Sequence, residues 1–319
     1  MPLNHLYKHI GNLLSPAGRG ARLSILIYHR VLAEPDQLFP NEVTTRRFDA
    51  QMAQLKAVFN VLPLHVAVDQ LRTGTLPARA ACITFDDGYA DNLTHATPIL
   101  KKHGLPATFF IATAYLNGGR MFNDTVIEAI RHSPLKILDL ASIGFGSFDI
   151  GDNAAKARAI GQILPQVKYL PLDEREQIVA RIAQLAQCGP LPNNLMMTTE
   201  QLQALHTAGM EIGGHTARHP IIAKLEADAV RQEISDGKAF LEQTLNTRIR
   251  LFAYPNGKPG TDYLPEQAVI VRNLGFDAAV STQCGSAEQS SDVFQLPRFT
   301  PWSPQPWRFI PMLLANLRG

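Results

Sequence analysis

Short apolar runs alternate with amphipathic helical patterns along most of the chain. Six short apolar runs, each followed by a turn signal or a polar loop, are typical of buried strands. They occupy residues 24–31, 80–85, 107–113, 210–214, 249–254 and 277–281. Helices are predicted between them, near 45–57, 90–103, 199–208, 226–246 and 264–274. Thr198, followed three residues later by Gln201, predicts a capping box at the start of the helix near 199.

This alternation predicts the class of fold. Strands that are apolar along their whole length are buried on both faces, as in a parallel sheet covered by helices. Five or more strand–helix units in one chain indicate an α/β protein, either a barrel or a doubly wound sheet. The sequence contains no internal repeat and no low-complexity tract that would favour another architecture.

Two segments depart from this alternation. Residues 1–22 are predicted to form a helical arm that packs on the rest of the chain, because apolar residues recur there at helical spacing. These residues are Leu3, Leu6, Ile10, Leu13 and Leu14. Residues 23–319 are interpreted as one domain. Within it, helical patches broken by Gly and Pro run from about 117 to 197 without a strong strand pattern, which indicates a largely helical insertion or cap.

Composition narrows the class of protein. Hydrophobic residues make up 45% of the chain and charged residues 18%, a balance typical of a globular protein and not of a disordered one. The 30 basic and 28 acidic residues leave a net charge of +2 without a dense basic run. This balance argues against a nucleic acid partner. The three cysteines lie far apart and form no CxxC pair, and the oligomeric state is left open.

The first residues contain no apolar stretch long enough for a signal peptide or a transmembrane segment. We therefore expect the chain in the cytoplasm by default. Association with a membrane through the helical arm is the alternative.

Two adjacent carboxylates follow the predicted strand at 80–85. The segment Thr84-Phe85-Asp86-Asp87-Gly88-Tyr89 places Asp86 and Asp87 at the carboxyl end of that strand, where sites of α/β folds assemble. A bend at Gly88 would let both side chains line one pocket in different roles. Because Asp-Asp-Gly is also ordinary turn chemistry, this segment alone leaves a solvated turn open.

Two histidines follow the predicted strand at 210–214, in Gly213-Gly214-His215-Thr216-Ala217-Arg218-His219-Pro220. Their four-residue spacing places the imidazoles of His215 and His219 on one side of a helical turn. Two neutral imidazoles and one carboxylate form part of a divalent metal site and leave positions for water and substrate. Such spacing also arises by chance, so the acidic pair is what favours the metal interpretation.

Together the two segments resemble the motifs of the polysaccharide deacetylases, the NodB-homology group. The first family motif, TFDDG, is intact at 84–88, and the second, H-[ST]-x-x-H, is intact at 215–219. The resemblance implies a distorted (β/α) barrel and makes 23–319 a deacetylase catalytic domain. It also implies that Asp86 is the general base and that Asp87, His215 and His219 bind the metal.

The later family motifs match less well. The segment Phe252-Ala253-Tyr254-Pro255-Asn256-Gly257 resembles the third motif, but Ala253 stands at its Arg position and Asn256 at its aromatic position. The resemblance assigns the backbone N–H of Asn256 to the oxyanion hole, a role that does not depend on the side chain. Tyr254 and Pro255 are expected beside it. Loss of the Arg removes a group that orients the base.

The acid that protonates the leaving amine is also displaced. The family's usual acid is a His in a late Leu-His motif, and the corresponding tail at 294–299 contains none. A branch that resembles poly-N-acetylglucosamine deacetylases carries a Tyr-His segment near its N-terminus, here Tyr28-His29. His29 is therefore the expected acid, with a structural or substrate-contact role as the alternative. Tyr89 and Arg298 are expected at the cleft, and Arg298 either binds substrate or holds the base.

The expected reaction is metal-assisted hydrolysis of the acetamide of an N-acetylated carbohydrate, which releases acetate. The implied cofactor is one divalent ion, with Zn preferred and Co, Ni, Fe or Mn compatible with the same ligands. Trp302 is a candidate to stack on a sugar, with packing as the alternative.

Three other functions stay open. A glycoside hydrolase would need its two carboxyl groups roughly 5–9.5 Å apart, which neighbouring residues satisfy poorly. The chain could instead be a catalytically impaired carbohydrate-binding member of the fold. The third alternative is a deacetylase of another amide, such as a lipid-linked sugar.

Overall fold

The computed structural model describes residues 2–301, 303 and 305–318. Seven parallel strands follow one another around a nearly closed barrel in the order β1-β3-β4-β7-β8-β9-β10, and the short strand β2 pairs beside β3. The strands are β1 (Leu23–Tyr28), β2 (Asn60–Val61), β3 (Ala80–Phe85), β4 (Thr108–Ile111), β7 (Glu211–Gly214), β8 (Leu251–Ala253), β9 (Ala278–Cys284) and β10 (Leu296–Arg298).

Residue Phe299, just beyond β10, brings the two edges of the barrel together. Its amide donates to the carbonyl of Ile25 at 2.7 Å, and its carbonyl accepts from the amide of Ile27 at 3.0 Å. Both partners belong to β1, so the first and last strands lie side by side. The predicted α/β barrel is thus confirmed, and the doubly wound alternative is wrong.

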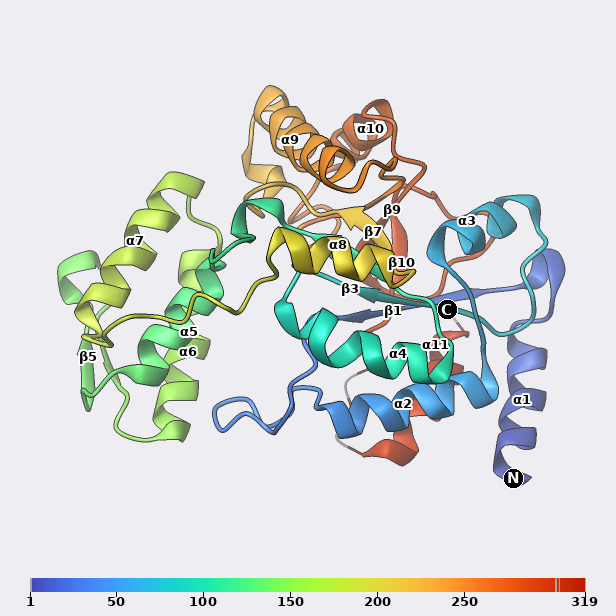
Figure 1. The fold of residues 1–319 in the computed structure, drawn as a ribbon, viewed down its shortest axis with the longest axis horizontal. Helices are drawn as coiled ribbons and strands as arrows, with labels where there is room; N and C mark the ends of the chain where they lie inside the picture. Colours follow the sequence, from blue (N-terminus) through green and yellow to red (C-terminus); the bar gives the residue numbers. More distant parts are fainter. Residues whose placement is uncertain (1, 302, 304, 319) are drawn as a thin grey trace.

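Helices surround the barrel (Figure 1). They are α2 (Thr45–Val58), α3 (Leu64–Thr73), α4 (Thr97–His103), α8 (Thr199–Thr207), α9 (Ala227–Leu245), α10 (Pro265–Asn273) and α11 (Phe309–Asn316). Helix α8 begins with the capping box expected from the sequence, because Thr198 accepts from the Gln201 amide and the Gln201 side chain accepts from the Thr198 amide. A short π-helical segment, η2 (Asn92–Ala96), precedes α4.

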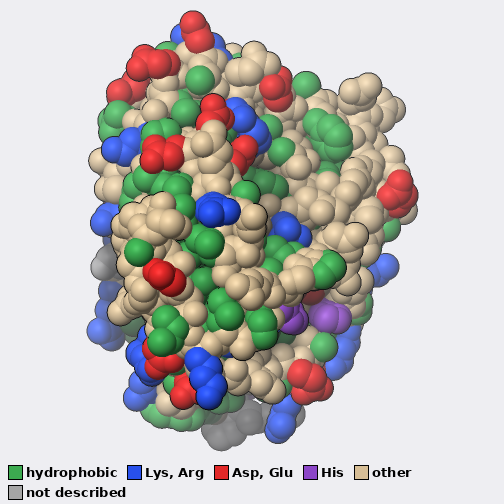
Figure 2. All heavy atoms as spheres, turned by 90° about the vertical axis from the view of Figure 1, so that its left-hand side faces the viewer, with side chains coloured by type: hydrophobic (Ala, Val, Ile, Leu, Met, Phe, Trp, Pro, Cys, Tyr) green, Lys and Arg blue, Asp and Glu red, His purple; other side chains and the backbone are tan. Residues whose placement is uncertain are grey.

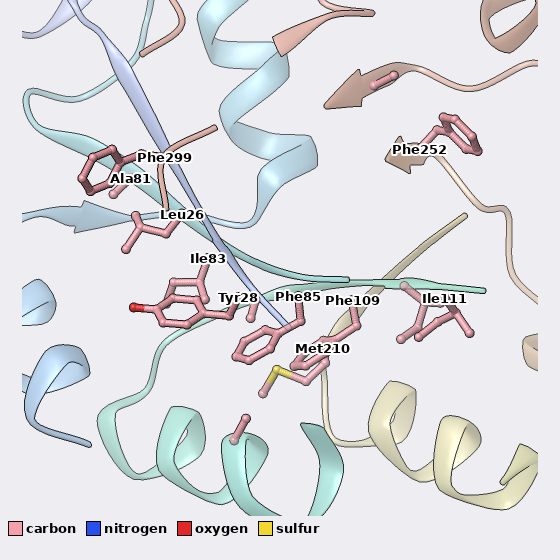
Figure 3. Close-up of a cluster of buried hydrophobic side chains, with 14 of the residues drawn as sticks. Leu26, Tyr28, Ala81, Ile83, Phe85, Phe109, Ile111, Met210, Phe252 and Phe299 are labelled. Atoms are coloured by element: carbon pink, nitrogen blue, oxygen red, sulfur yellow. The ribbon is translucent and has the colours of Figure 1, made fainter. Parts of the chain in front are cut away.

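Apolar residues alternate between two clusters along the strands, as a period of two requires. On β1, Leu26 and Tyr28 belong to the larger cluster under the outer helices, whereas Leu23 and Ile25 belong to a second cluster that includes α3. Figure 3 shows the larger cluster, where the rings of Tyr28, Phe85 and Phe109 lie in a row. Their centroids are 5.4 Å and 4.7 Å apart. This packing fixes the strand ends that carry the site.

An insertion between β4 and β7 forms a separate lobe at one end of the barrel (Figure 1). It contains α5 (Phe122–His132), an antiparallel pair of strands β5 (Ile137–Asp139) and β6 (Ser147–Asp149), α6 (Asn153–Lys168) and α7 (Leu172–Leu185). The short strand pair had no strong signal in the sequence. Of the buried residues in the lobe's apolar cluster, Leu38 is contributed by the loop after β1. Arg131 of α5 also pairs with Asp36 of that loop at 2.7 Å.

The N-terminal helix α1 (Pro2–Leu14) contacts α2 and α11. Its residues Ile10 and Leu14 pack against the core, while Leu3, Leu6 and Leu13 are 52–74% exposed. No helix in the described part of the chain is long and apolar enough to cross a membrane. On the face that carries the insertion, acidic and basic side chains are interspersed (Figure 2), in keeping with the balanced net charge.

Candidate metal centre

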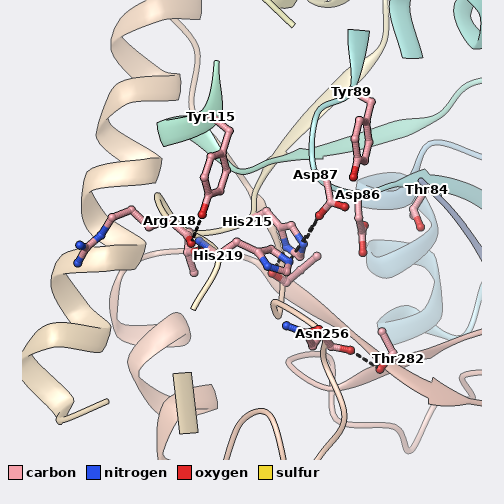
Figure 4. Close-up of polar contacts among 12 residues, drawn as sticks. Thr84, Asp86, Asp87, Tyr89, Tyr115, His215, Arg218, His219, Asn256 and Thr282 are labelled. Atoms are coloured by element: carbon pink, nitrogen blue, oxygen red, sulfur yellow. Dashed lines mark hydrogen bonds and ion pairs between the residues drawn. The ribbon is translucent and has the colours of Figure 1, made fainter. Parts of the chain in front are cut away.

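The residues singled out in the sequence follow four strands at the same end of the barrel. Asp86 and Asp87 come directly after β3, His215 after β7 and His29 after β1, while Asn256 lies three residues beyond β8. Carboxyl ends of parallel barrel strands meet at one rim, which is where sites of such folds assemble. Figure 4 shows Asp86 and Asp87 gathered at this rim with His215, His219 and Asn256.

The chain turns sharply after Asp86, and this turn separates the two carboxylates. Asp87 has φ +77° and Gly88 has φ +94°. The Asp86 amide still bonds to the carbonyl of Tyr28 on β1. A Cβ at position 88 would lie 3.2 Å from Ile111, so glycine also suits the close approach of β4. The two acids therefore face different partners.

Asp87 lies between the two histidines. Its Oδ1 is 3.4 Å from Nε2 of His215 and 3.5 Å from Nε2 of His219. The three candidate ligand atoms all lie within 4.8 Å of one another, and the three side chains are 1–6% exposed. Nδ1 of His215 lies 2.7 Å from the carbonyl of Ala253, so a proton on Nδ1 would leave Nε2 free to face Asp87.

The buried atoms of this group fit a divalent ion. Within the part of the chain that the structure describes, Oδ1 of Asp87 has no hydrogen-bond partner. A buried carboxylate oxygen without a donor is costly, and a cation bound between it and two imidazole nitrogens removes that cost. The donor set of one carboxylate and two imidazoles suits Zn and several other divalent metals.

The local electrostatics keep Asp87 ionised and His219 neutral. Burial raises the pKa of Asp87, but the close contact with His215 and the charges of the nearby histidines outweigh it and hold the pKa well below its usual value. Burial also lowers the pKa of His219, to about 3, with the charge of His215 acting in the same direction. His219 is therefore neutral, which is the state that ligates metal.

Asp86 is held by Arg298 of β10. The guanidinium donates from Nη1 to Oδ1 and from Nη2 to Oδ2, each at 2.7 Å, and both side chains are almost fully buried. Burial alone would raise the pKa of Asp86, but the Arg298 charge lowers it below its usual value. Arg298 also donates to the carbonyl of Ser281 at 2.8 Å. A guanidinium thus orients this carboxylate although Ala253 stands at the family's Arg position.

The segment after β8 turns through two residues with positive φ, Asn256 at +58° and Gly257 at +71°. Thr282 fixes the turn, because its hydroxyl donates to the Asn256 carbonyl at 2.7 Å and its amide donates to the Gly257 carbonyl at 2.8 Å. Asn256 lines the cleft beside the metal centre.

Two residues expected at the cleft beside Asn256, Tyr254 and Pro255, are not among those that line it. The Tyr254 hydroxyl donates to the carbonyl of Phe294, and its ring stacks on Tyr263 at 3.8 Å in the core. Tyr254 and Pro255 are both buried, and the structure does not bring them to the lining of the cleft.

His29 is exposed and lines the same cleft as Asp86 and Asp87. Its backbone carbonyl accepts from the side chain of Asn92 at 2.8 Å, which fixes the end of β1. Tyr89 lies in a smaller adjoining recess that also contacts His29 and Asp87. The Tyr89 hydroxyl donates to Asp124 of the insertion at 3.1 Å.

The cleft has a volume of about 510 Å³, and one of its walls comes from the insertion. That wall includes Phe122, Asn123, Leu164, Pro165, Lys168 and Tyr169. The sequence did not indicate this wall, because the apolar spacing of helices α5 and α6 carries no sign of which end faces the rim. Trp302, considered earlier for sugar stacking, lies outside the described residues.

A comparison with known proteins identifies the family in which this arrangement of residues belongs. The model of the family described as polysaccharide deacetylase matches residues 73–279. The chain therefore belongs to the polysaccharide deacetylase family. The match contains Asp86, Asp87, His215 and His219, whereas His29 and Arg298 lie on either side of it. Members of this family act on N-acetylated carbohydrates.

A curated relative and two solved structures are similar over most of their length. YxkH of Bacillus subtilis (strain 168), named as a candidate polysaccharide deacetylase, is 20% identical over 280 residues, which are 87% of this chain and 71% of YxkH. The Streptococcus pyogenes deacetylase PplD, solved with acetate, has a TM-score of 0.61 and 20% identity, with 94% of this chain and 99% of that chain covered. IcaB from Ammonifex degensii has the same TM-score and identity, with 96% and 99% covered. At this identity the two structures support the fold alone.

Proposed function

We propose that the chain hydrolyses N-acetyl groups of an N-acetylated poly- or oligosaccharide and releases acetate. One observation carries the proposal: the buried group of Asp87, His215 and His219 lies beside a second carboxylate, Asp86, which Arg298 keeps ionised. A metal site next to a free base is the arrangement that hydrolysis of an amide by water requires.

The proposed roles follow from position. When bound, a divalent ion at Asp87, His215 and His219 would polarise the acetyl carbonyl and acidify a water molecule. Asp86 accepts the proton of the attacking water, because its carboxylate is ionised and directed at the same cleft. The backbone N–H of Asn256 stabilises the negative charge that develops on the acetyl oxygen. His29, which lines the same cleft, donates a proton to the departing amine.

Within the family, we propose a substrate of N-acetylhexosamine units, as in poly-N-acetylglucosamine. The support is the placement of His29 at the rim by β1, since the chain lacks a histidine in the tail at 294–299. A lipid-linked sugar with the same acetamide remains the alternative substrate, because the chemistry at the metal centre would be identical.

The two carboxylates argue against a glycoside hydrolase. Such an enzyme needs a protonated carboxyl as its general acid, with a raised pKa. Here the pKa values of Asp86 and Asp87 are both lowered, the first by Arg298 and the second by the histidines. Neither side chain is suited to protonate a glycosidic oxygen.

Acetate release over a panel of N-acetylated oligosaccharides tests the proposal directly. The chain is first treated with chelator, then assayed alone and after addition of Zn²⁺, Co²⁺, Ni²⁺, Fe²⁺ or Mn²⁺. We expect acetate only with metal, and none from the Asp86→Asn variant under the same conditions. Acetate release that survives metal removal would refute the mechanism, and sugar binding without acetate release would indicate a carbohydrate-binding protein.

A further inference from the structure

The loop that carries the two histidines has an unusual backbone. Thr216 has φ +62° and His219 has φ +51°, although neither is glycine. Such conformations cost about 1–3 kcal/mol each and persist only where surrounding contacts hold them. The side chain of His219 adds little support of its own, because its Nδ1 has no hydrogen-bond partner among the described residues. His215, in contrast, is anchored through Ala253. The position of His219 therefore depends on contacts to its backbone.

Several of these contacts come from the barrel and its helices. Glu233 of α9 accepts from the Arg218 amide at 2.9 Å and from the Arg218 side chain at 2.7 Å. The Tyr115 hydroxyl donates to the Arg218 carbonyl at 2.7 Å, as the dashed line in Figure 4 marks. Helix α9 lies so close that a Cβ at Gly237 would be 2.8 Å from the Thr216 carbonyl. The loop is thus held from two sides.

A third contact comes from the insertion. Arg175 of α7 is 1% exposed, and its Nη2 lies 3.5 Å from the carbonyl oxygens of both Arg218 and His219, longer than a standard hydrogen bond but close enough for its charge to attract both carbonyl dipoles. Its guanidinium carbon lies 4.4 Å from the ring centroid of Phe122, which lines the cleft.

Arg175 is a buried cation without a counterion. Throughout the described residues no carboxylate forms an ion pair with it, although the charges of Glu176 and Glu233 act on it from farther away, and its Nε has no acceptor. Burying an unpaired charge costs several kcal/mol, so a purely structural position would be better filled by an apolar residue. The acceptors that the guanidinium does have are the two carbonyls of the histidine loop.

We propose that Arg175 is a positioning residue for the metal centre. Its guanidinium draws the carbonyls of Arg218 and His219 toward α7 and so keeps Nε2 of His219 directed at Asp87. The insertion is then part of the assembly of the metal site as well as a wall of the cleft. This inference rests on the proposed function only in requiring that Asp87, His215 and His219 bind a divalent ion.

Two effects of Arg175 on metal affinity have opposite signs, which makes the proposal testable. Its positive charge repels a nearby divalent ion, so loss of the charge alone would tighten binding. Its contacts to the loop orient a ligand, and loss of such contacts typically weakens metal affinity by about 10–100-fold. The proposal states that orientation outweighs repulsion.

The test compares the full-length wild type with Arg175→Met, Arg175→Lys and the control Arg181→Met, an exposed arginine on the same helix. Zn²⁺ and Co²⁺ affinities are measured by competition with a chromophoric chelator, independently of activity. We expect Arg175→Met to bind each ion about 10–100-fold more weakly. Arg175→Lys should fall between it and the wild type, since an ammonium lacks the planar fork. Arg181→Met should match the wild type.

Hydrogen exchange provides a second readout that a purely structural role would not change. Because coupling between two sites is reciprocal, metal should slow amide exchange in α7 of the wild type but not of Arg175→Met. Affinity in Arg175→Met equal to or tighter than wild type overturns the proposal. If that variant does not fold without metal, wild-type affinity in Arg175→Lys overturns it instead. A wild type that binds no divalent ion refutes the proposed function itself, which separates the two failures.

Discussion

Replacement of Arg298 by methionine should separate the orientation of the base from the rest of the site. Arg298 makes two hydrogen bonds of 2.7 Å to Asp86 and further bonds to the Ser281 carbonyl and the Thr84 hydroxyl. Methionine fills much of the volume but leaves the buried carboxylate unpaired. Removal of one partner of a buried ion pair costs about 3–5 kcal/mol. Urea unfolding near neutral pH measures this loss directly.

The same substitution should change the pH dependence of acetate release. In the wild type the pKa of Asp86 lies below its usual value, because the Arg298 charge outweighs burial. Without Arg298, burial raises the pKa of Asp86, so the base is protonated at higher pH and the acidic limb of kcat/KM moves upward. Each unit of this movement corresponds to about 1.4 kcal/mol of interaction lost by the ionised form.

A double variant decides whether the unpaired charge is the cause. Asp86→Asn combined with Arg298→Met removes both charges, so it should be more stable than Arg298→Met alone even though it carries one more substitution. Arg298→Lys is the matched control, since it keeps the charge and loses the paired geometry. Unfolding free energy of Arg298→Met within about 1 kcal/mol of wild type, with an unchanged pH profile, would refute the reasoning.

Three further outcomes follow from the site. Asp86→Asn should retain metal affinity and lose turnover, whereas His215→Ala should lose both; normal deacetylation by the Asn variant would contradict the base assignment. His29→Ala should lower kcat, and unchanged rates across pH would return His29 to a structural role. Burial raises the pKa of Asp124 from 3.8 to about 7, so stability should fall as pH rises between these values. Asp124→Asn should therefore raise the free energy of unfolding more near pH 8 than near pH 4, by up to about 4 kcal/mol in urea unfolding. An equal change at both pH values would show that the charge of buried Asp124 does not lower stability.

The strands and helices that carry the site were predictable because each has a strong local signal. The run at 80–85 coincides with β3, and the pattern near 226–246 became α9, 227–245. Other elements lacked such a signal. Strand β10 has three residues with a proline in the middle, and it forms by pairing with β9, while Phe299 just beyond it pairs with β1 to close the barrel. Helices α3 and α11 were also missed, since their stability comes from the clusters they cover.

The residues of the candidate site also fall into those with a local signal in the sequence and those without one. Two short segments with fixed internal spacing contain Asp86, Asp87, His215 and His219, so these four residues were predictable from the sequence alone. The contribution of the insertion was invisible, because Arg175 is one of two arginines on an ordinary amphipathic helix, and its burial depends on how the lobe meets the rim. No local pattern distinguishes a buried arginine from the exposed Arg181 six residues later.

The substitution at Ala253 shows why a motif and a function need not change together. The physical requirement at the rim is a cation that balances the buried carboxylate of Asp86, and it sets no condition on which strand supplies that cation. In a nearly closed barrel, β10 lies beside β1, and β1 pairs with β3, so a long side chain from β10 can reach the end of β3. Arg298 does so and meets the same carboxylate with two hydrogen bonds. The missing arginine of the third motif therefore does not by itself indicate an impaired base; an unpaired Asp86 would.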